Sequence, residues 1–570
     1  MTYQEKYNFW QSSPYFDTKT KKQLEDIKNS PAEIKDRFEK ELEFGTGGLR
    51  GIVGAGTNRM NIYTVRKASQ GLADHVSDKN GKSPSVVIGL DSRRQSALFA
   101  AEAAKVFVGN GISVYLFSEP RPTPMLSFAI RQLHASAGVM ITASHNPKEY
   151  NGYKVYGDDG AQLSDTSAVS IAIAGIEDIT RVRLLEDEEA IKAGLLHVIG
   201  KEMDDAYISC IKALAANNQN VKKHASSVRI VYTPLHGVGG EMVSRALKEL
   251  GFNDFNVVEN QFAPNGNFPT LNITLNPEDR PVYEQALMLG KEIDADLIIA
   301  TDPDCDRMGV MVRKSKNRYV LLTGNEAGAL MLDNLLYQRR HENLANSFVA
   351  KTIVTTQMAD RIAQHYGIGI EEVLTGFKYI GDLIHKLHET GEKQFFFGLE
   401  DSCGYLAGTD VRDKDGVIGC MLITETATWY KSKGMSLYKG LKRLRKKYGW
   451  FAGQLVTCQM NEDQSRRLSE SLFSDLRGAE FKDIEVIAVR NYAVRLRHDL
   501  KSGELSQLSL PKSNVVYYEL ADGWFCIRPS GTESKLKLYI EVWGRNKNNT
   551  KNKLNKIKTN VMQSLVSITR

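Results

Sequence analysis

Three aspartates, each separated from the next by one residue, follow a short apolar stretch near the middle of the chain. Asp302, Asp304 and Asp306 come directly after residues 297–300, which are Leu, Ile, Ile and Ala. In an extended segment, side chains two residues apart point to the same side. Three carboxylates gathered there repel one another strongly unless a cation neutralises them. The spacing therefore indicates a site for a hard cation, most simply Mg²⁺, while a solvated acidic loop is the ordinary alternative.

An EF-hand is one calcium site that this aspartate run excludes. Such a loop has Gly at its sixth position and Glu at its twelfth. Counted from Asp302, these positions hold Arg307 and Arg313. A cation site that keeps room for a phosphate group therefore suits the run better.

A serine at the end of another apolar stretch is a candidate nucleophile. Residues 138–141 lead into the polar turn 142–147, Thr-Ala-Ser-His-Asn-Pro, which contains Ser144. A serine in such a turn more often forms or caps the turn than reacts. No G-x-S-x-G elbow surrounds Ser144, so a hydrolase triad is unsupported. Lys154 follows within ten residues and brings an amine close to this turn.

Two further polar segments have the residue types that bind phosphate and sugar. Residues 528–535 combine Arg528, hydroxyl side chains and a glycine between two expected strands. A guanidinium beside free backbone N–H groups makes a phosphate cradle, and an ordinary hairpin turn is the alternative. Glu400 and Ser402 follow the aromatic run 395–397, and acidic and hydroxyl groups at a strand end suit the hydroxyls of a sugar.

The common nucleotide-binding signatures are missing from the sequence. There is no G-x-x-x-x-G-K-[ST] segment, so a P-loop kinase supplied by ATP is unsupported. The glycine-rich residues 45–51 also miss the G-x-G-x-x-G spacing, because the sixth residue is Arg50.

Apolar, β-branched stretches alternate with longer helical patterns through most of the chain. This alternation predicts layered α/β domains, in which ligands gather where the strands end. Strands are expected at residues 86–90, 138–142, 228–232, 296–300, 347–354 and 394–399, and helices at 97–110, 241–250, 326–337 and 417–431. The C-terminal part differs: strands at 514–518, 524–528 and 536–543 precede one helix, which is an α+β pattern.

The composition is typical of a soluble globular protein with several cores. The chain has 570 residues, of which 42% are apolar and 25% charged. Its first residues are polar and no stretch is long enough to span a membrane, so we expect a cytoplasmic protein. The cysteines are scattered without a C-x-x-C pair, which argues against disulfides and a zinc site. They are Cys210, Cys305, Cys403, Cys420, Cys458 and Cys526.

Two basic runs, 439–447 and 551–558, raise the question of nucleic-acid binding. In both, apolar residues recur at helical spacing. They are Leu437, Leu441, Leu444 and Tyr448 around the first run, and Leu554, Ile557, Val561, Leu565 and Ile568 around the second. The basic residues are therefore interpreted as the wet face of amphipathic helices, and no nucleic-acid partner is expected. The net charge of +6 suits an anionic small substrate without requiring one.

Taken together, these segments resemble the signatures of the α-D-phosphohexomutase superfamily, in the order in which that family has them. The matches are a phosphoserine loop at 142–147, a metal loop at 302–306, a sugar loop at 400–402 and a phosphate loop at 528–532. Supporting segments at 44–51, 89–93, 323–326 and 375–378 extend the resemblance over nearly the whole chain. Its length and the Arg-Asp-Lys-Asp-Gly segment at 412–416 are most similar to the phosphoglucomutase and phosphopentomutase branch.

The resemblance implies an α/β fold with four domains around a central cleft. Three related α/β domains with mixed sheets are expected, followed by a smaller C-terminal α+β domain. The expected boundaries are 1–205 with the phosphoserine loop, 206–322 with the metal loop, 323–450 with the sugar loop and 451–570 with the phosphate loop.

The resemblance also implies a reaction cycle on a sugar phosphate. Phosphorylated Ser144 gives its phosphoryl group to one end of the sugar phosphate, and the resulting bisphosphate turns end for end and returns its other phosphate to the serine. One Mg²⁺ per chain is expected on Asp302, Asp304, Asp306 and an oxygen of the phosphoserine. Glucose 1,6-bisphosphate is expected as the primer.

The other site residues are carried over from the resemblance by position. Arg50 and Lys154 are expected near the phosphoserine, and Lys154 or Lys414 is the candidate general base if burial beside cations lowers its pKa. Gly404 stands where the short phosphomannomutases carry a histidine, which favours Lys414. Substrate contacts are expected from Thr375, Gly376, Lys378, Glu400, Ser402, Arg528, Ser530, Gly531 and Thr532.

The leading interpretation is an isomerase that interconverts α-D-glucose 1-phosphate and glucose 6-phosphate. Phosphopentomutase and phosphomannomutase activities are alternatives of the same class, and a sugar-1,6-bisphosphate synthase is an alternative from another. A non-catalytic binding protein is disfavoured because Ser144, the three aspartates and Arg528 are all intact. The oligomeric state is left open.

Overall fold

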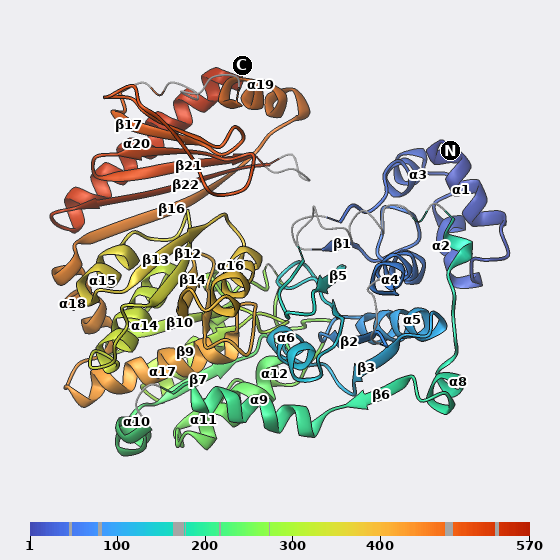
Figure 1. Ribbon diagram of the computed structural model, residues 1–570, viewed down its shortest axis with the longest axis horizontal. Helices are drawn as coiled ribbons and strands as arrows, with labels where there is room; N and C mark the ends of the chain where they lie inside the picture. The colour runs from blue at the N-terminus through green and yellow to red at the C-terminus, as the bar shows by residue number, and fades with distance from the viewer. Residues whose placement is uncertain are drawn as a thin grey trace. The chain divides into compact units, whose positions relative to one another are not determined.

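The protein is described by a computed structural model, shown in Figure 1. The described residues are 1–44, 48–77, 83–163, 176, 178–215, 218–272, 274–473, 481, 483–529 and 535–569. They form two compact units, Met1–His341 with Gly376–Leu437, and Glu342–Thr375 with Tyr438–Arg570. No described helix is both long enough and apolar enough to cross a membrane.

The first sheet of the first unit has six strands in the order β1-β5-β4-β2-β3-β6. They are β1 (Leu49–Ile52), β2 (Ser85–Leu90), β3 (Ser113–Phe117), β4 (Ala137–Ile141), β5 (Tyr150–Tyr156) and β6 (Leu196–Ile199). The sheet is mixed, because β5 runs antiparallel to both β1 and β4 while the other pairs are parallel. Helices α5 (Ser96–Gly109) and α6 (Thr123–Gln132) pack on β2.

Three short helices precede this sheet and have a small core of their own. They are α1 (Tyr3–Ser12), α2 (Thr18–Asp26) and α3 (Pro31–Phe38), and the core includes Trp10, Phe16, Phe38 and Tyr63 of α4 (Ile62–Ser77). The first helix begins with a capping box: the Thr2 side chain accepts from the N–H of Glu5, whose carboxylate accepts from the N–H of Thr2.

The second sheet of this unit is also mixed, in the order β11-β10-β9-β7-β8. Its strands are β7 (Ile230–Thr233), β8 (Phe255–Val257), β9 (Leu297–Thr301), β10 (Met308–Ser315) and β11 (Arg318–Leu321). All five residues of β9 are buried, as expected for a strand covered on both faces. Helices α9 (Lys201–Ala213), α11 (Gly239–Glu249) and α13 (Glu284–Glu292) belong to this region.

The rest of the first unit holds the antiparallel pair β14 (Gln394–Glu400) and β15 (Gly404–Ala407), with helices α14 (Gly324–Gln338), α16 (Phe377–Glu389) and α17 (Gly416–Ser432). The start of α17 is fixed by Asp415, whose carboxylate accepts hydrogen bonds from the N–H groups of Val417 and Ile418. Almost every residue of this helix is buried, as expected for a helix with apolar residues on nearly all sides.

The second unit contains a parallel strand pair and an antiparallel sheet. The pair is β12 (Ser347–Thr352) with β13 (Gly369–Val373). The sheet has seven strands in the order β16-β22-β21-β20-β17-β18-β19. They are β16 (Trp450–Gln459), β17 (Val486–Asn491), β18 (Leu496–Asp499), β19 (Leu505–Gln507), β20 (Val516–Leu520), β21 (Gly523–Pro529) and β22 (Lys535–Gly544), accompanied by α15 (Met358–Tyr366), α18 (Leu437–Tyr448), α19 (Glu462–Phe473) and α20 (Lys547–Thr569).

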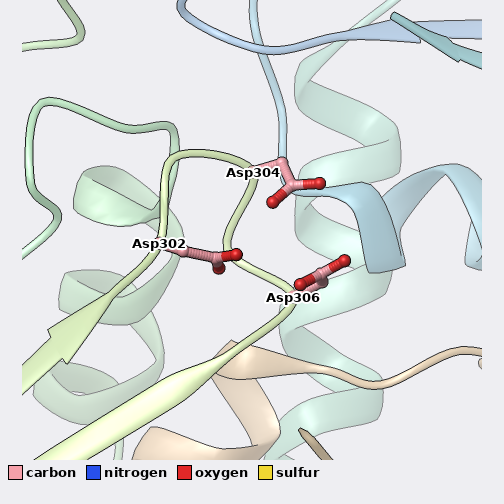
Figure 2. A group of neighbouring side chains, drawn as sticks. All are labelled: Asp302, Asp304 and Asp306. Atoms are coloured by element: carbon pink, nitrogen blue, oxygen red, sulfur yellow. The ribbon is translucent and has the colours of Figure 1, made fainter. Parts of the chain in front are cut away.

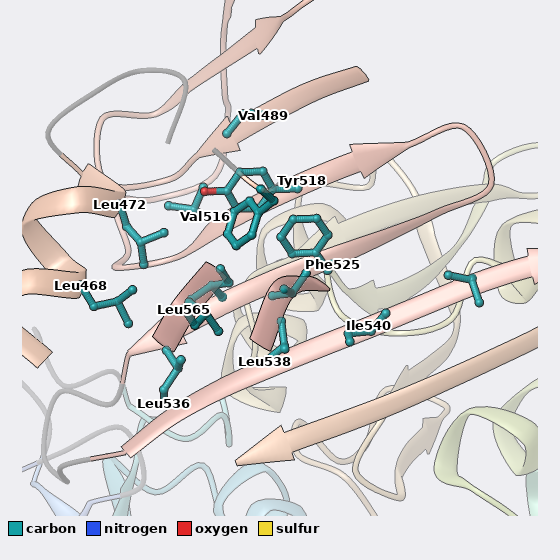
Figure 3. Packing of buried hydrophobic residues seen from close by; sticks show 14 of the residues in the cluster. Leu468, Leu472, Val489, Val516, Tyr518, Phe525, Leu536, Leu538, Ile540 and Leu565 are labelled. Atoms are coloured by element: carbon teal, nitrogen blue, oxygen red, sulfur yellow. The ribbon is translucent and has the colours of Figure 1, made fainter. Parts of the chain in front are cut away.

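Figure 3 shows the apolar core between this sheet and its helices. Tyr518 and Phe525 stack with ring centroids 4.5 Å apart, and Phe481 meets both rings edge-on. Leu538 of β22 is fully buried beside them.

Every strand and helix expected from the sequence is present, with ends that differ by a few residues. The basic runs lie on α18 and α20, where the apolar stripes face inward, so the solvated-face interpretation is confirmed. The sequence did not indicate β16 to β19 or α19 in the C-terminal part. No residue of β18 or β19 is buried, and neither strand has the apolar stretch by which strands are recognised. β17 does begin with an apolar run, Val-Ile-Ala-Val, which the sequence analysis left unassigned.

We predict that Leu538→Ala lowers the free energy of unfolding of the second unit by about 2–5 kcal/mol, because it removes a fully buried side chain and leaves a cavity. Urea unfolding followed by fluorescence measures the change. Leu505→Ala is the matched control: Leu505 lies on the same sheet but is 49% exposed, and its truncation should change stability by less than about 0.5 kcal/mol. Equal losses in the two variants would show that Leu538 is not part of the core.

Candidate active site

The three aspartates of the metal loop converge between β9 and β10, as Figure 2 shows. All are buried, and each offers a carboxylate oxygen within 4.8 Å of the others. The carboxylates converge, as their spacing predicted, but the prediction that the backbone there is extended is wrong. The N–H of Cys305 donates to the carbonyl of Asp302 at 2.9 Å, and Cys305 has φ of 54°. The loop is therefore a turn, and the turn brings the carboxylates together.

The ionised forms of these aspartates are not equally stabilised by their surroundings. Burial, and then repulsion from Asp306 and Asp304, raises the pKa of Asp302 well above its usual range. Burial alone would also raise the pKa of Asp306, but the ammonium groups of Lys414 and Lys154 outweigh it and lower that pKa. The cluster therefore combines a carboxyl group that resists ionisation with a carboxylate held firmly charged.

The aspartate oxygens fit a divalent cation. Oδ1 of Asp304 and Oδ1 of Asp306 are buried and accept no hydrogen bond within the described chain. Buried oxygens without a donor are rare in proteins, and carboxylate oxygens are the ligands that hard cations prefer. The donor set is thus suited to a metal ion of this kind.

Two lysines from distant segments contact these aspartates. Nζ of Lys154, on β5, lies 2.8 Å from Oδ2 of Asp304 and 3.1 Å from Oδ2 of Asp306. Nζ of Lys414 lies 2.9 Å from the same Asp306 oxygen. Burial opposes the charge of both lysines, but attraction to the carboxylates outweighs it and raises the pKa of each. The nearest charges to both ammonium groups are therefore anionic.

Ser144 faces the metal loop. It follows β4 in a left-handed backbone conformation, with φ of 51°, and is 3% exposed. Its own N–H donates to Oγ1 of Thr142 at 2.8 Å, which closes the turn. Its Oγ donates to Oδ2 of Asp302 at 3.0 Å. The serine hydroxyl and the aspartate cluster, 158 residues apart in the chain, are in direct contact.

The Ser144 loop is held in this conformation by one buried arginine, Arg93. Its guanidinium forms an ion pair with Asp91, with Nε 3.3 Å from Oδ2. It also donates to four backbone carbonyls, those of Ser144, Asn146, Pro147 and Tyr150. The family resemblance included the segment 89–93, but no role was predicted for Arg93. A guanidinium that binds backbone oxygens does not require particular residue types at the positions it contacts, so the sequence does not indicate it.

Arg50 lies on β1 and donates to Oδ1 of Asn146 at 2.8 Å, at the rim of the same loop. Strand β1 pairs with β5, with Arg50 opposite Gly152. Lys154 lies on the same strand, β5, two residues further on. Burial lowers the pKa of Arg50, an effect that Asp304 opposes. The glycine-rich residues 45–47 before it are outside the described residues.

Glu400 and Gly404 lie beside Lys414. Glu400 ends β14 and is buried; burial raises its pKa, which Lys414 opposes along with a hydrogen bond from Ser402. A Cβ atom at Gly404 would lie 2.6 Å from Oε1 of Glu400 and 2.9 Å from Cδ of Lys414. The absence of a side chain at 404 therefore makes the room that Lys414 and Glu400 occupy.

The remaining predicted residues lie on other segments of the chain or outside the described residues. Lys378 is buried in the first turn of α16, the helix that begins directly after Gly376. Thr375 and Arg528 belong to the second unit, where Arg528 on β21 stands opposite Lys537 of β22. Ser530, Gly531 and Thr532 lie outside the described residues. The roles of these residues stay predictions.

Comparison with protein families gives consistent matches along the chain. Models of phosphoglucomutase/phosphomannomutase α/β/α domains I, II and III match residues 41–179, 205–316 and 323–448. The model of the C-terminal domain of the same family matches residues 478–548. The predicted fold class, three α/β domains followed by a different C-terminal domain, is confirmed.

Individual relatives agree with these models. A phosphoglucomutase of Staphylococcus epidermidis is 37% identical over 508 residues, which cover 88% of this chain and 90% of the relative. A phosphoglucomutase of Staphylococcus aureus is 36% identical over 531 residues, covering 92% and 94%. Among solved structures, the open form of the Paramecium phosphoglucomutase parafusin has a TM-score of 0.70 at 18% identity, covering 92% of this chain and 95% of its own. A phosphoglucomutase/phosphomannomutase family protein of Burkholderia thailandensis has a TM-score of 0.65 at 17% identity, covering 93% and 98%.

We predict that Arg93→Met destabilises the first unit by more than about 3 kcal/mol, because four backbone carbonyls lose a donor and the buried Asp91 carboxylate loses its ion-pair partner. Urea unfolding measures this change. Arg94→Met is the matched control, since Arg94 is the neighbouring residue but is exposed, and its effect should stay below about 0.5 kcal/mol. An Arg93 variant as stable as the Arg94 variant would contradict the role given to this guanidinium.

Proposed function

Because this chain belongs to the phosphoglucomutase/phosphomannomutase family, we propose that it interconverts α-D-glucose 1-phosphate and glucose 6-phosphate with Ser144 as phosphoryl carrier. The enzyme class predicted from the sequence, an isomerase of the phosphoglucomutase type, is confirmed by this membership. The observation that carries the assignment of Ser144 is its 3.0 Å contact with Asp302, inside a buried cluster of carboxylates and ammonium groups.

The proposed cycle has two phosphoryl transfers. In the first, the bond between phosphorus and Ser144 Oγ breaks while a sugar hydroxyl oxygen bonds to phosphorus and loses its proton, which gives a bisphosphate. In the second, the other phosphate returns to Oγ, and the sugar oxygen that it leaves takes up a proton. Glucose 1,6-bisphosphate serves as the primer that phosphorylates Ser144. Positive groups around the transferring phosphate stabilise the negative charge on its oxygens, and Arg50 and Lys154 supply them.

We assign Asp302, Asp304, Asp306 and a phosphoserine oxygen as the ligands of one Mg²⁺ per chain. When bound there, Mg²⁺ supplies a Lewis acid that withdraws charge from the transferring phosphoryl group. The buried oxygens of Asp304 and Asp306 that accept no hydrogen bond support this assignment.

Lys414 is the better candidate for moving the proton of the sugar hydroxyl. Lys154 lies 2.8 Å and 3.1 Å from oxygens of two metal-loop aspartates. Lys414 lies 2.9 Å from one of them, Asp306, and it lies next to Glu400 of the sugar loop. The raised pKa of Lys414, in which attraction to carboxylates outweighs burial, suits the half-reaction that returns a proton to the sugar oxygen. The opposite half-reaction needs the neutral amine.

The substrate contacts follow from the same proposal. Glu400 and Ser402 bind hydroxyls of the sugar in either orientation. The loop with Arg528, Ser530, Gly531 and Thr532 binds the phosphate that is not reacting, and Thr375, Gly376 and Lys378 make further substrate contacts. Four domains divide the chain at 1–205, 206–322, 323–450 and 451–570, so that each contributes one loop. Sugar phosphates as the substrates and six unpaired cysteines suit a cytoplasmic protein.

Sugar specificity is tested by a coupled assay with Mg²⁺ on glucose, mannose and ribose 1-phosphates, with and without the bisphosphate primer. We predict that glucose 1-phosphate is converted fastest and that the primer increases its rate. Preference for ribose or mannose 1-phosphate would support the phosphopentomutase or phosphomannomutase alternative, and net accumulation of bisphosphate would support a synthase. No turnover of any of them would contradict the proposed function.

Ser144→Ala should lower kcat at least about 10³-fold, because no other described hydroxyl contacts Asp302. Ser118→Ala is the control: Ser118 is an exposed serine of the same sheet region and its loss should leave kcat unchanged. An active Ser144 variant would show that the phosphate is carried elsewhere or transferred directly.

For the metal, we predict that Asp304→Asn weakens Mg²⁺ binding at least about tenfold, because it removes a charged oxygen ligand. Isothermal titration calorimetry measures this without turnover. Asp254→Asn, which alters a half-exposed ion pair with Arg229 in the same sheet region, should bind Mg²⁺ like the wild type. Unchanged affinity in the Asp304 variant would place the metal at another site.

A further inference from the structure

The loop that carries Lys414 is fixed at both ends by other parts of the first unit. The N–H of Arg412 donates to Oγ of Ser127 at 2.8 Å. Tyr207 donates through its hydroxyl to Oδ2 of Asp415 at 2.8 Å, and the N–H of Gly416 donates to the carbonyl of Cys305 in the metal loop at 3.1 Å. The position of the Lys414 ammonium therefore depends on the side-chain contacts of residues 413 and 414, which lie between these fixed points.

Between the anchors, Asp413 is the residue that competes for the ammonium. Its Oδ1 accepts the backbone N–H of Lys414 at 2.8 Å and lies 3.5 Å from Nζ of the same residue. Asp306 holds Nζ more closely, at 2.9 Å. Since Asp413 is 1% exposed, its carboxylate needs partners within the protein.

Tyr156 supplies such a partner. Its hydroxyl donates to Oδ2 of Asp413 at 2.9 Å, and the ring is fully buried. Tyr156 follows Lys154 by two residues on β5, so both side chains lie on the same face of that strand. One strand thus provides a cation to the aspartate cluster and a hydroxyl donor to the aspartate next to Lys414.

We propose that Tyr156 is a positioning residue for Lys414: by satisfying Asp413, it leaves the ammonium on Asp306, beside Glu400. Without the hydroxyl, Oδ2 of Asp413 is a buried acceptor that lacks its donor, and Nζ of Lys414 already lies 3.5 Å from the other oxygen of the same carboxylate. The ammonium then moves from Asp306 toward Asp413 and away from the sugar hydroxyls. This inference rests on the proposed function for its effect on turnover, but the movement of Lys414 does not depend on that function.

The test compares Tyr156→Phe with Tyr153→Phe. Tyr153 is also a fully buried tyrosine of β5, on the opposite face, and its hydroxyl lies 3.0 Å from Oγ of Ser69, away from the aspartates. Both variants keep the ring and lose one buried hydrogen bond, so their stabilities should fall equally. We expect kcat for glucose 1-phosphate to fall about tenfold in Tyr156→Phe, with KM and Mg²⁺ affinity within about twofold of wild type, and no comparable change in Tyr153→Phe.

Equal kcat in the two variants, or a change confined to KM, would overturn the proposal. In an Asp413→Asn background, Tyr156→Phe should have no further effect on kcat, because the carboxylate through which it acts is gone. A crystal structure of Tyr156→Phe provides the readout that is independent of turnover: Nζ of Lys414 should lie closer to Asp413 than to Asp306. If Nζ of Lys414 stays on Asp306, the inference is wrong, even if the wild-type enzyme is an active mutase. If the wild type has no mutase activity, only the proposed function is contradicted.

Discussion

The burial of three aspartate carboxylates in one turn is the constraint on which the first unit depends. Asp302, Asp304 and Asp306 are at most 1% exposed, and buried carboxylates are stable only when opposite charges or donors compensate for the lost water. Lys154 of β5 and Lys414 of the 412–416 loop provide the charges. Because these lysines come from segments far apart in sequence, the aspartates can be compensated only in a folded unit that brings all three segments together. The same arrangement places Ser144 against Asp302.

The metal loop itself is held from three directions by backbone hydrogen bonds. The N–H of Thr123, at the start of α6, donates to the carbonyl of Asp304. The N–H of Val238 donates to the carbonyl of Pro303, and that of Gly416 to Cys305. A Cβ at Gly237 would lie 2.5 Å from Cα of Pro303, so the supporting loop approaches too closely for a side chain there. These contacts fix carboxylate positions before any ligand binds, which is the preorganisation that electrostatic catalysis requires.

The sequence predicted the chemistry of this site better than its geometry. Aspartates two residues apart after an apolar strand, and a serine in a turn after another, were recognisable because residue type and spacing are themselves the signal. The turn at Cys305 and the clamp of Arg93 on four carbonyls were not, since backbone conformation and backbone hydrogen bonds are nearly independent of the residues involved. The pKa of Lys414 could not be predicted from the sequence either, because its direction depends on which charges the fold places nearest. Strands β18 and β19 lack apolar stretches because none of their residues is buried, whereas β17 begins with an apolar run that was not assigned from the sequence.

The central claim is that Ser144, in contact with the aspartate cluster, carries the phosphoryl group. The most direct measurement is mass spectrometry of the protein after incubation with Mg²⁺ and glucose 1,6-bisphosphate, with the modified peptide sequenced. We predict one addition of about 80 Da per chain, located on Ser144, and no addition in Ser144→Ala. A phosphate on any other residue, or none under conditions where the enzyme turns over, would contradict it.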